Sequence, residues 1–132
     1  MNCLFCKIVN GEIKSTTLYE DDFVKVIMDI NPECDGHTLI IPKNHYNDFT
    51  EIPKELWDHI YKVAKKIGNE LSNKLQTKGY RFVINYGDYQ EIKHFHLHIL
   101  PNPNKKATLK IEETYSLLTT KKTSNSELVN KK

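Results

Sequence analysis

Hydrophobic residues recur along this chain with two different periods, one helical and one extended. In residues 4–10, and again from about residue 53 to residue 78, they return every three or four positions, which is the spacing of one face of a helix. Short runs rich in β-branched and aromatic residues predict strands instead. Three such runs lie at residues 23–29, 37–42 and 81–86.

The boundaries of these elements carry suitable residues. Pro53 suits the first position of the long helix, and Gly79 suits its end. Residues 30–36 contain Asn, Pro, Asp and Gly, which together favour a turn. The sequence therefore predicts an antiparallel hairpin followed by one long helix, so the fold class is α+β. At 132 residues, the chain is long enough for one domain with its own core.

The long helix has a second apolar edge beside its main stripe. Trp57 and Tyr61 form this edge, which leaves room for a helix of a second subunit. We therefore expect a homodimer. His59 lies on the same helix away from the stripe, and we expect its side chain to be solvated and without a role.

Residues 94–100 carry the most distinctive pattern in the chain, because three histidines alternate with apolar residues. Successive side chains of a strand point to opposite faces, so in a strand His94, His96 and His98 share one face. Histidines in a row can bind a metal, attack as nucleophiles, or bind an anion passively. No acidic ligand follows closely in sequence, and neighbours ~6.6 Å apart suit a relay along a phosphate. We therefore favour a nucleophilic histidine that acts at phosphorus.

The three cysteines do not indicate a disulfide framework. Their number is odd, and the N-terminus lacks the apolar stretch of a secretion signal. Cys3 and Cys6 form a Cys-x-x-Cys pair, which could be half of a zinc site, a redox dithiol or two small core residues. His45 and the triad histidines could supply the other zinc ligands.

The formal net charge of +2 is unevenly distributed. Residues 102–132 carry seven lysines and three glutamates, which leaves residues 1–101 with a charge of −2. Arg81 is the only arginine, and there is no basic stripe, so we expect no binding to nucleic acid. No apolar run is long enough to cross a membrane, and we expect a cytoplasmic protein without membrane contact. The polar, Lys-rich end predicts partial disorder, with one weak element at residues 111–118.

The run His-Phe-His-Leu-His-Ile-Leu at residues 94–100 resembles the motif that names the histidine triad (HIT) family of nucleotide hydrolases and transferases. The resemblance covers residues 1–101, including the opening Cys-Leu-Phe-Cys, the segment around Asp29 and residues 36–45. It implies a histidine triad domain at residues 1–103 and a tail at 104–132. It also implies the HIT fold, an antiparallel sheet of about five strands with one long and one short helix. Family members pair through the long helix and the neighbouring strand.

The resemblance further implies a mechanism and a substrate class. His96 would attack the α-phosphate of a purine nucleotide, such as a nucleoside phosphoramidate or a dinucleoside polyphosphate, and form a covalent nucleotidyl-histidine. His98 and His37 would contact the phosphate and help to transfer protons. The nucleotide-binding positions are Asp29 for the ribose hydroxyls, Asn85 and Gln90 for the phosphate, and Leu4, Phe5, Ile8, Ile27 and Ile30 for the base.

In family members with an early Cys-x-x-Cys, these cysteines help to bind a structural zinc ion. The matching ligands in this chain are Cys3, Cys6, His45 and His94. The resemblance therefore assigns His94 a structural role, distinct from the catalytic role of His96.

The chain departs from the family pattern beside the triad. The loop at residues 87–90 is short, and Glu91 stands where many members have Ser or Thr near the phosphate. A carboxylate at this position would repel a phosphate unless it turned away. A nucleotide-binding regulatory protein with little turnover is therefore the alternative function. Pro101 and Asn102 after the triad do not decide between the phosphoramidase and polyphosphate hydrolase branches.

Overall fold

The computed structural model describes residues 3–102 and 105–119. The predicted disorder of residues 120–132 lies outside the described residues. The helices are α1 (Leu4–Val9), α2 (Lys54–Leu75) and α3 (Ile111–Thr119). The strands are β1 (Thr17–Glu20), β2 (Val24–Met28), β3 (Thr38–Pro42), β4 (Arg81–Ile84) and β5 (Leu97–Leu100). No helix in the described part of the chain is both long and apolar enough to cross a membrane.

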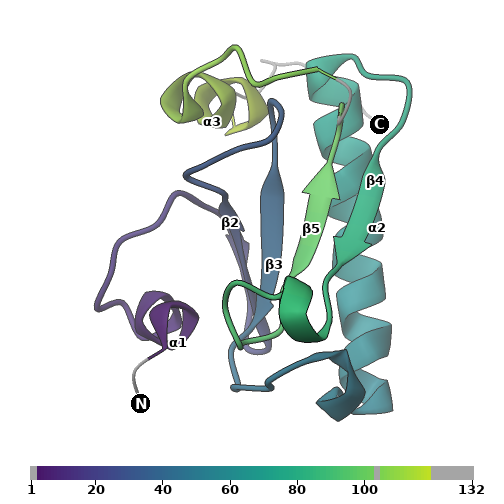
Figure 1. Cartoon of the computed structure of the whole chain (residues 1–132). Helices are drawn as coiled ribbons and strands as arrows, with labels where there is room; N and C mark the ends of the chain where they lie inside the picture. The colour runs from purple at the N-terminus through teal and green to yellow at the C-terminus, as the bar shows by residue number, and fades with distance from the viewer. Residues whose placement is uncertain (1–2, 103–104, 120–132) are drawn as a thin grey trace.

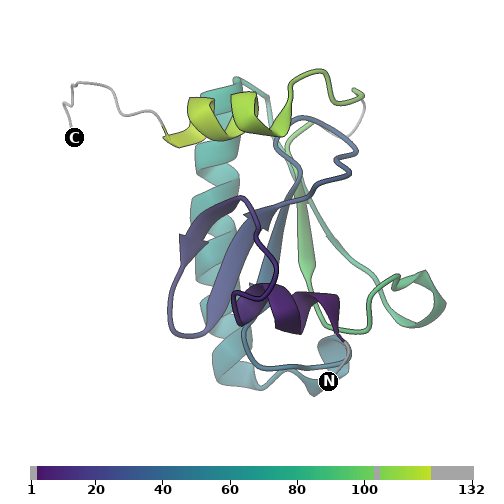
Figure 2. The ribbon, with the colours of Figure 1, turned by 90° about the vertical axis from the view of Figure 1, so that its left-hand side faces the viewer.

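The strands form one antiparallel sheet in the order β1-β2-β3-β5-β4, which confirms the α+β prediction. Helix α2 runs along one face of the sheet, and α1 lies on the opposite side (Figures 1 and 2). Helix α3 lies across one end of the sheet and contacts α2 (Figure 1). The sheet therefore has a helix on each face, and its central strand β3 is buried at all five residues.

Alternating strand residues face two separate cores, as the two-residue period of a strand requires. On the α2 side, strand residues such as Val26 and Ile40 pack with Ile60 and Ile67 of α2. The core on the α1 side is smaller. Its buried members are Cys3, Phe5, Ile8, Ile27, Leu39 and Ile41.

Helix α2 forms where the apolar stripe predicts it, but its ends differ from the prediction. Pro53 is the residue before the helix rather than its first residue. The helix ends at Gln76, which adopts a left-handed conformation with φ of 57°, and not at Gly79. Gly68 is required inside the helix, because a Cβ there would lie 2.6 Å from the ring of Tyr80. Trp57, on the apolar edge that the sequence left for a partner helix, also packs on its own core: its ring centroid lies 5.5 Å from that of buried Phe95, edge to face.

Three other elements differ from the sequence prediction. The alternation predicts a triad strand over residues 94–100, but β5 includes only Leu97–Leu100. Strand β1, at Thr17–Glu20, is not predicted, because its four residues show no apolar–polar alternation and none of them is fully buried. The weak element predicted at residues 111–118 is helix α3. The segment before it is fixed by Asp35, whose carboxylate accepts hydrogen bonds from Thr108 and Leu109 at 2.8–2.9 Å.

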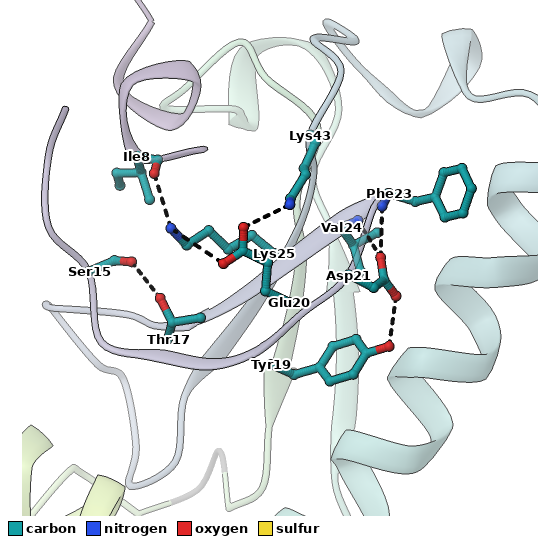
Figure 3. A network of polar contacts seen from close by, with 10 residues as sticks. All are labelled: Ile8, Ser15, Thr17, Tyr19, Glu20, Asp21, Phe23, Val24, Lys25 and Lys43. Carbon is teal, nitrogen blue, oxygen red and sulfur yellow. Dashed lines mark hydrogen bonds and ion pairs between the residues drawn. The ribbon is translucent and has the colours of Figure 1, made fainter. Parts of the chain in front are cut away.

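A network of polar contacts joins the β1–β2 hairpin to α1 (Figure 3). The Lys25 ammonium donates to the backbone carbonyl of Ile8 at 3.2 Å, near the C-terminal end of α1. It also lies 4.0 Å from the Glu20 carboxylate, which in turn pairs with Lys43 at 2.7 Å. This network fixes the C-terminal end of α1 to the sheet.

Asp21 organises the turn of the same hairpin (Figure 3). Its carboxylate accepts hydrogen bonds from the backbone N–H groups of Phe23 and Val24 and from the Tyr19 hydroxyl, at 2.7–2.9 Å. His59 Nε2 lies 2.6 Å from the same carboxylate, so the prediction of a solvated His59 is wrong. Burial alone would raise the pKa of Asp21, but these hydrogen bonds outweigh burial and lower the pKa to about 2.

We expect Asp21→Asn to lower the free energy of unfolding by about 1–2 kcal/mol at pH 7. Because the pKa of Asp21 is lowered in the folded state, this stability is present above about pH 4 and is lost as the pH falls toward 2. Urea titrations at pH 7 and near pH 2.5 measure the difference. Asp22→Asn is the control, because Asp22 is exposed on the same turn. An equal loss for both variants would contradict this role of Asp21.

Candidate functional site

The three triad histidines occupy two different environments rather than one row. His94 lies three residues before β5 and is fully buried. Its Nδ1 is 3.4 Å from the Cys3 sulfur and 3.5 Å from the Cys6 sulfur. The rings of His96 and His98 are instead neighbours, with centroids 4.9 Å apart.

A cluster of two cysteines and two histidines could hold a metal ion. Cys3 and Cys6 come from the start of α1, His45 follows β3, and His94 precedes β5. Their ligand atoms all lie within 4.8 Å of one another. The structure thus brings together all four residues that the sequence nominates for zinc.

The imidazole orientations in this cluster fit metal binding. His94 Nε2 lies 2.8 Å from the carbonyl of Pro42, and His45 Nε2 lies 3.0 Å from the side-chain oxygen of Asn47. Each Nε2 must donate to its oxygen, which leaves each Nδ1 as an unprotonated acceptor beside the sulfurs. Burial lowers the pKa of His94 to about 4, so its ring is neutral at pH 7. Two thiols and two imidazoles with such outer partners are a typical zinc donor set.

A second group of histidines is connected by a chain of hydrogen bonds. The backbone N–H of Glu33 donates to His37 Nδ1 at 3.0 Å. His37 must therefore carry its proton on Nε2, which lies 2.9 Å from His98 Nδ1 and 3.4 Å from the Asp29 carboxylate. His98 Nδ1 accepts that hydrogen bond, so the proton of His98 is on Nε2. This Nε2–H is buried and has no partner within the described residues.

His96 has the opposite tautomer to His98. Its Nδ1 lies 2.8 Å from the backbone carbonyl of His94 and must donate to it. The lone pair of His96 is therefore on Nε2. Burial lowers the pKa of His96 below its usual range, so the ring is neutral and nucleophilic at pH 7.

Burial also favours the neutral form of His37 and of His98. Burial lowers the pKa of His37, although Asp29 and Glu33 oppose this effect. Burial, together with the neighbouring His96 and His37, lowers the pKa of His98 to about 4. A bound phosphate would favour the protonated imidazole and raise this pKa.

A cavity of about 350 Å³ lies beside these histidines. It is lined by His37, His96 and His98, by Asp29, Glu33 and Glu91, and by Asn31, Asn85 and Tyr89. The residues that carry the unprotonated Nε2 of His96 and the unpartnered N–H of His98 thus line one space together with several hydrogen-bonding side chains. This arrangement can transfer a group to His96 while His98 supplies a proton.

The predicted nucleotide residues are distributed unevenly around this cavity. Asp29 and Asn85 both line it. Phe5, Ile8 and Ile27 are buried in the core on the α1 side, and the Phe5 ring lies 4.8 Å from that of His96. The other two predicted base-pocket residues are more open, with Leu4 43% and Ile30 75% exposed.

Gln90 does not reach the cavity. Its side-chain amide is buried and donates to the backbone carbonyls of Asn47 and Ile92, at 2.8 and 3.4 Å. It therefore supports the loop before the triad instead of facing a phosphate.

Sequence reasoning missed three residues of the cavity, Asn31, Glu33 and Tyr89. Asn31 and Glu33 belong to the turn before His37, and Tyr89 belongs to the loop at residues 87–90. The Asn, Pro, Asp and Gly residues at positions 30–36 indicate a loop directly before His37, and this signal could have pointed to Asn31 and Glu33. The hydrogen bond from the Glu33 backbone was not visible, since any residue except proline could make it.

The comparison with known families decides what this fold and site belong to. A model of the HIT domain matches residues 10–105, which is more than half of the chain. The chain belongs to the HIT family. The four-residue Cys/His cluster and the triad are therefore features of a HIT protein.

Relatives and solved structures agree with this assignment. An uncharacterized HIT-like protein of Methanocaldococcus jannaschii is 47% identical over 102 residues, which cover 75% of this chain and 78% of that protein. The adenosine 5′-monophosphoramidase HNT1 of Saccharomyces cerevisiae is 37% identical, over 81% of this chain and 66% of that protein. The crystal structure of a Zn-bound histidine triad family protein from Mycobacterium smegmatis superposes with a TM-score of 0.82. That protein is 35% identical, with 89% of this chain and 91% of the other covered.

The tautomers of the site histidines can be measured directly. We expect two-bond ¹⁵N–¹H correlation spectra at pH 7 to show His37 and His98 protonated at Nε2 and His96 protonated at Nδ1. Glu33→Pro removes the backbone donor to His37 and should allow the other tautomer of His37 and His98. Glu33→Ala keeps the donor and should leave both tautomers unchanged. An Nδ1-protonated His98 in the unsubstituted protein would contradict this chain of hydrogen bonds.

Proposed function

We propose that this protein is a nucleotide hydrolase that cleaves a purine nucleoside phosphoramidate through a covalent nucleotidyl-histidine. One observation carries the proposal: the lone pair of His96 Nε2 and the unpartnered N–H of His98 Nε2 belong to residues that line the same cavity. A nucleophile beside a proton donor is what group transfer from phosphorus requires. The 37% identity to a protein named adenosine 5′-monophosphoramidase supports this substrate class.

In the first step, His96 Nε2 attacks the α-phosphorus and the bond from phosphorus to the leaving nitrogen breaks. The phosphate charge favours uptake of one proton by the hydrogen-bonded pair of His37 and His98. The Nε2–H of His98 then passes to the leaving nitrogen as that nitrogen takes the bonding electrons, and the pair returns to its neutral form. The His96 ring becomes a cation in this step. The carbonyl of His94, which accepts its Nδ1–H, stabilises that charge.

In the second step, water attacks the phosphorus from the side that the leaving group has vacated. His98 is now neutral and accepts a proton from this water. The bond to His96 breaks, and a nucleoside monophosphate is released. In this proposal Asp29 accepts hydrogen bonds from the ribose hydroxyls, and Asn85 donates to the phosphate. The base lies near Leu4, Phe5, Ile8, Ile27 and Ile30.

We expect His96→Ala to lower kcat by more than about 10⁴-fold and to change nucleotide affinity by only a few-fold. Removal of the nucleophile acts on the transition state, whereas ground-state binding depends on other groups. Turnover of adenosine 5′-phosphoramidate and calorimetric titration with adenosine monophosphate measure the two quantities. More than a tenth of the unsubstituted activity in the variant would rule out His96 as the nucleophile. Tight binding without turnover by the unsubstituted protein would favour the regulatory alternative.

We further propose that Cys3, Cys6, His45 and His94 bind one structural zinc ion. The two sulfurs and two unprotonated Nδ1 atoms supply four ligands, which complete a tetrahedral site without a position for water. The similar protein from Mycobacterium smegmatis is Zn-bound in its crystal structure, which supports the choice of metal. The four residues would connect α1, the segment after β3 and the approach to β5.

We expect about one zinc ion per chain by elemental analysis of protein purified without chelators or metal-affinity resin. Replacement of both Cys3 and Cys6 by serine should remove the metal and lower the melting temperature, because metal binding is linked to folding. Cys34→Ser is the control, since Cys34 is buried outside the cluster. Zinc well below one per chain, or a double variant of unchanged stability, would leave these cysteines as packing residues.

The protein is also proposed to form a two-fold homodimer through α2 and β4. Strand β4 is an edge of the sheet, and its Phe82 and Ile84 are 43% and 40% exposed. Tyr86 after the strand and Tyr61 on α2 are 55% and 62% exposed. Apolar side chains that lie exposed on an edge strand favour burial by a second copy.

Light scattering at micromolar concentration should give about twice the mass of one chain. Phe82→Glu should shift the protein toward monomer by placing a charge on the proposed interface. Ile13→Glu changes an exposed isoleucine in the segment between α1 and β1 and should leave the mass unchanged. A single species of ~15 kDa for the unsubstituted protein would rule out the dimer.

A further inference from the structure

The cavity beside His96 has an unusual charge for a site that handles a phosphate. Its lining includes Asp29, Glu33 and Glu91, but no lysine and not the single arginine. Lys93, the nearest lysine in sequence to Glu91, donates to the backbone carbonyl of Gly87 at 2.6 Å. The only groups in the lining that can become cations are therefore histidines.

The three carboxylates do not have equivalent surroundings. Asp29 accepts a hydrogen bond from the backbone N–H of Asn31 at 2.9 Å and lies 3.4 Å from His37. Glu33 and Glu91 are exposed, and within the described residues neither side chain has a hydrogen-bond or ion-pair partner. Their charges are not neutralised by the protein. A ligand beside them would be attracted or repelled according to its own charge.

The aromatic residue of the cavity lining favours a positively charged ligand, as the two carboxylates do. Tyr89 is 81% exposed and lies on the loop next to Glu91. The face of an aromatic ring attracts ammonium groups. Two free carboxylates and an open tyrosine ring are thus suited to a cation and poorly suited to a second phosphate or a sulfate.

We propose that Glu33 and Glu91 select a leaving group that carries a positive charge, so that the preferred substrates are nucleoside phosphoramidates of amines that bear a second, cationic group. This inference rests on the proposed phosphoramidate cleavage and concerns only which leaving group is taken. The bond from phosphorus to nitrogen breaks as described above, and the amine leaves with the proton from His98. The second cationic group of the amine stays charged and lies near the two carboxylates.

The expected selectivity follows from the charges. A unit charge about 7 Å from a carboxylate in a solvent-like dielectric changes kcat/KM by about threefold. Two carboxylates therefore separate a cationic from an anionic leaving group by at least about tenfold at low ionic strength. Salt screens exposed charges beyond about 10 Å at 0.1 M, so this ratio should fall as salt is added.

The test uses adenosine 5′-phosphoramidates of three amines of matched length: 1,4-diaminobutane, n-butylamine and 4-aminobutyrate. We expect kcat/KM to decrease in this order, with the spread reduced at 0.5 M salt. Glu33→Gln and Glu91→Gln should each reduce the ratio of cationic to anionic substrate severalfold. Glu91→Lys should bring the three kcat/KM values close together, because the added positive charge opposes that of the Glu33 carboxylate. Asp88→Asn removes an exposed carboxylate of the same loop that does not line the cavity and should leave the ratios unchanged.

Equal turnover of all three amines would overturn this inference but leave the proposed hydrolase intact. Preferential turnover of a diadenosine polyphosphate with Mg²⁺ would also overturn it. If Asp88→Asn changes the ratios as much as Glu33→Gln and Glu91→Gln do, the effect comes from the net charge of the protein and not from the cavity lining, which would also overturn the inference. No turnover of any substrate would contradict the proposed function itself.

Discussion

Backbone groups set the orientation of the histidines in this site, and the chemistry depends on that constraint. The carbonyl of Pro42 fixes His94, the carbonyl of His94 fixes His96, and the N–H of Glu33 fixes His37. Through His37, the last bond also fixes His98. Since an imidazole has one donor and one acceptor when neutral, each backbone partner decides which nitrogen carries the proton. The fold therefore leaves an unprotonated Nε2 on His96 and an Nε2–H on His98, as the proposed mechanism requires.

The short segment at residues 94–96 contributes side chains to two different places, the Cys/His cluster and the cavity. His94 and His96 are only two residues apart, yet His94 points to the cysteines and His96 contributes to the cavity. The two side chains point to different places because the hydrogen-bonded pairing of β3 with β5 starts only at Leu97. Before Leu97 the chain is irregular, and the backbone N–H of Phe95 bonds to the carbonyl of Tyr46. The same short segment thus contacts both the proposed zinc site and the proposed active site.

Much of the scaffold could be predicted from sequence, because it follows from periodicity. The apolar stripe of α2 and the β-branched runs of β2 and β3 all form the predicted elements. The predicted triad strand is too long, since alternation alone cannot show that residues 94–96 pair with no neighbouring strand. Strand β1 was missed because a four-residue edge strand with two adjacent apolar residues shows no alternation. The helix end at Gln76 depends on a left-handed conformation that composition does not reveal.

The site could be predicted in part. The motif nominated the histidines and the cysteines, and the structure gathers both groups. The tautomers and the isolation of Gln90 from the cavity depend on backbone hydrogen bonds, which no residue type encodes. The proposed mechanism requires His96 to be the nucleophile. Its most direct test is rapid quench of the protein with adenosine 5′-phosphoramidate, followed by peptide mass spectrometry under conditions that preserve phosphoramidate bonds. We predict one adenylyl group per active chain, attached to His96; an adduct on another residue, or turnover without any adduct, would contradict the account.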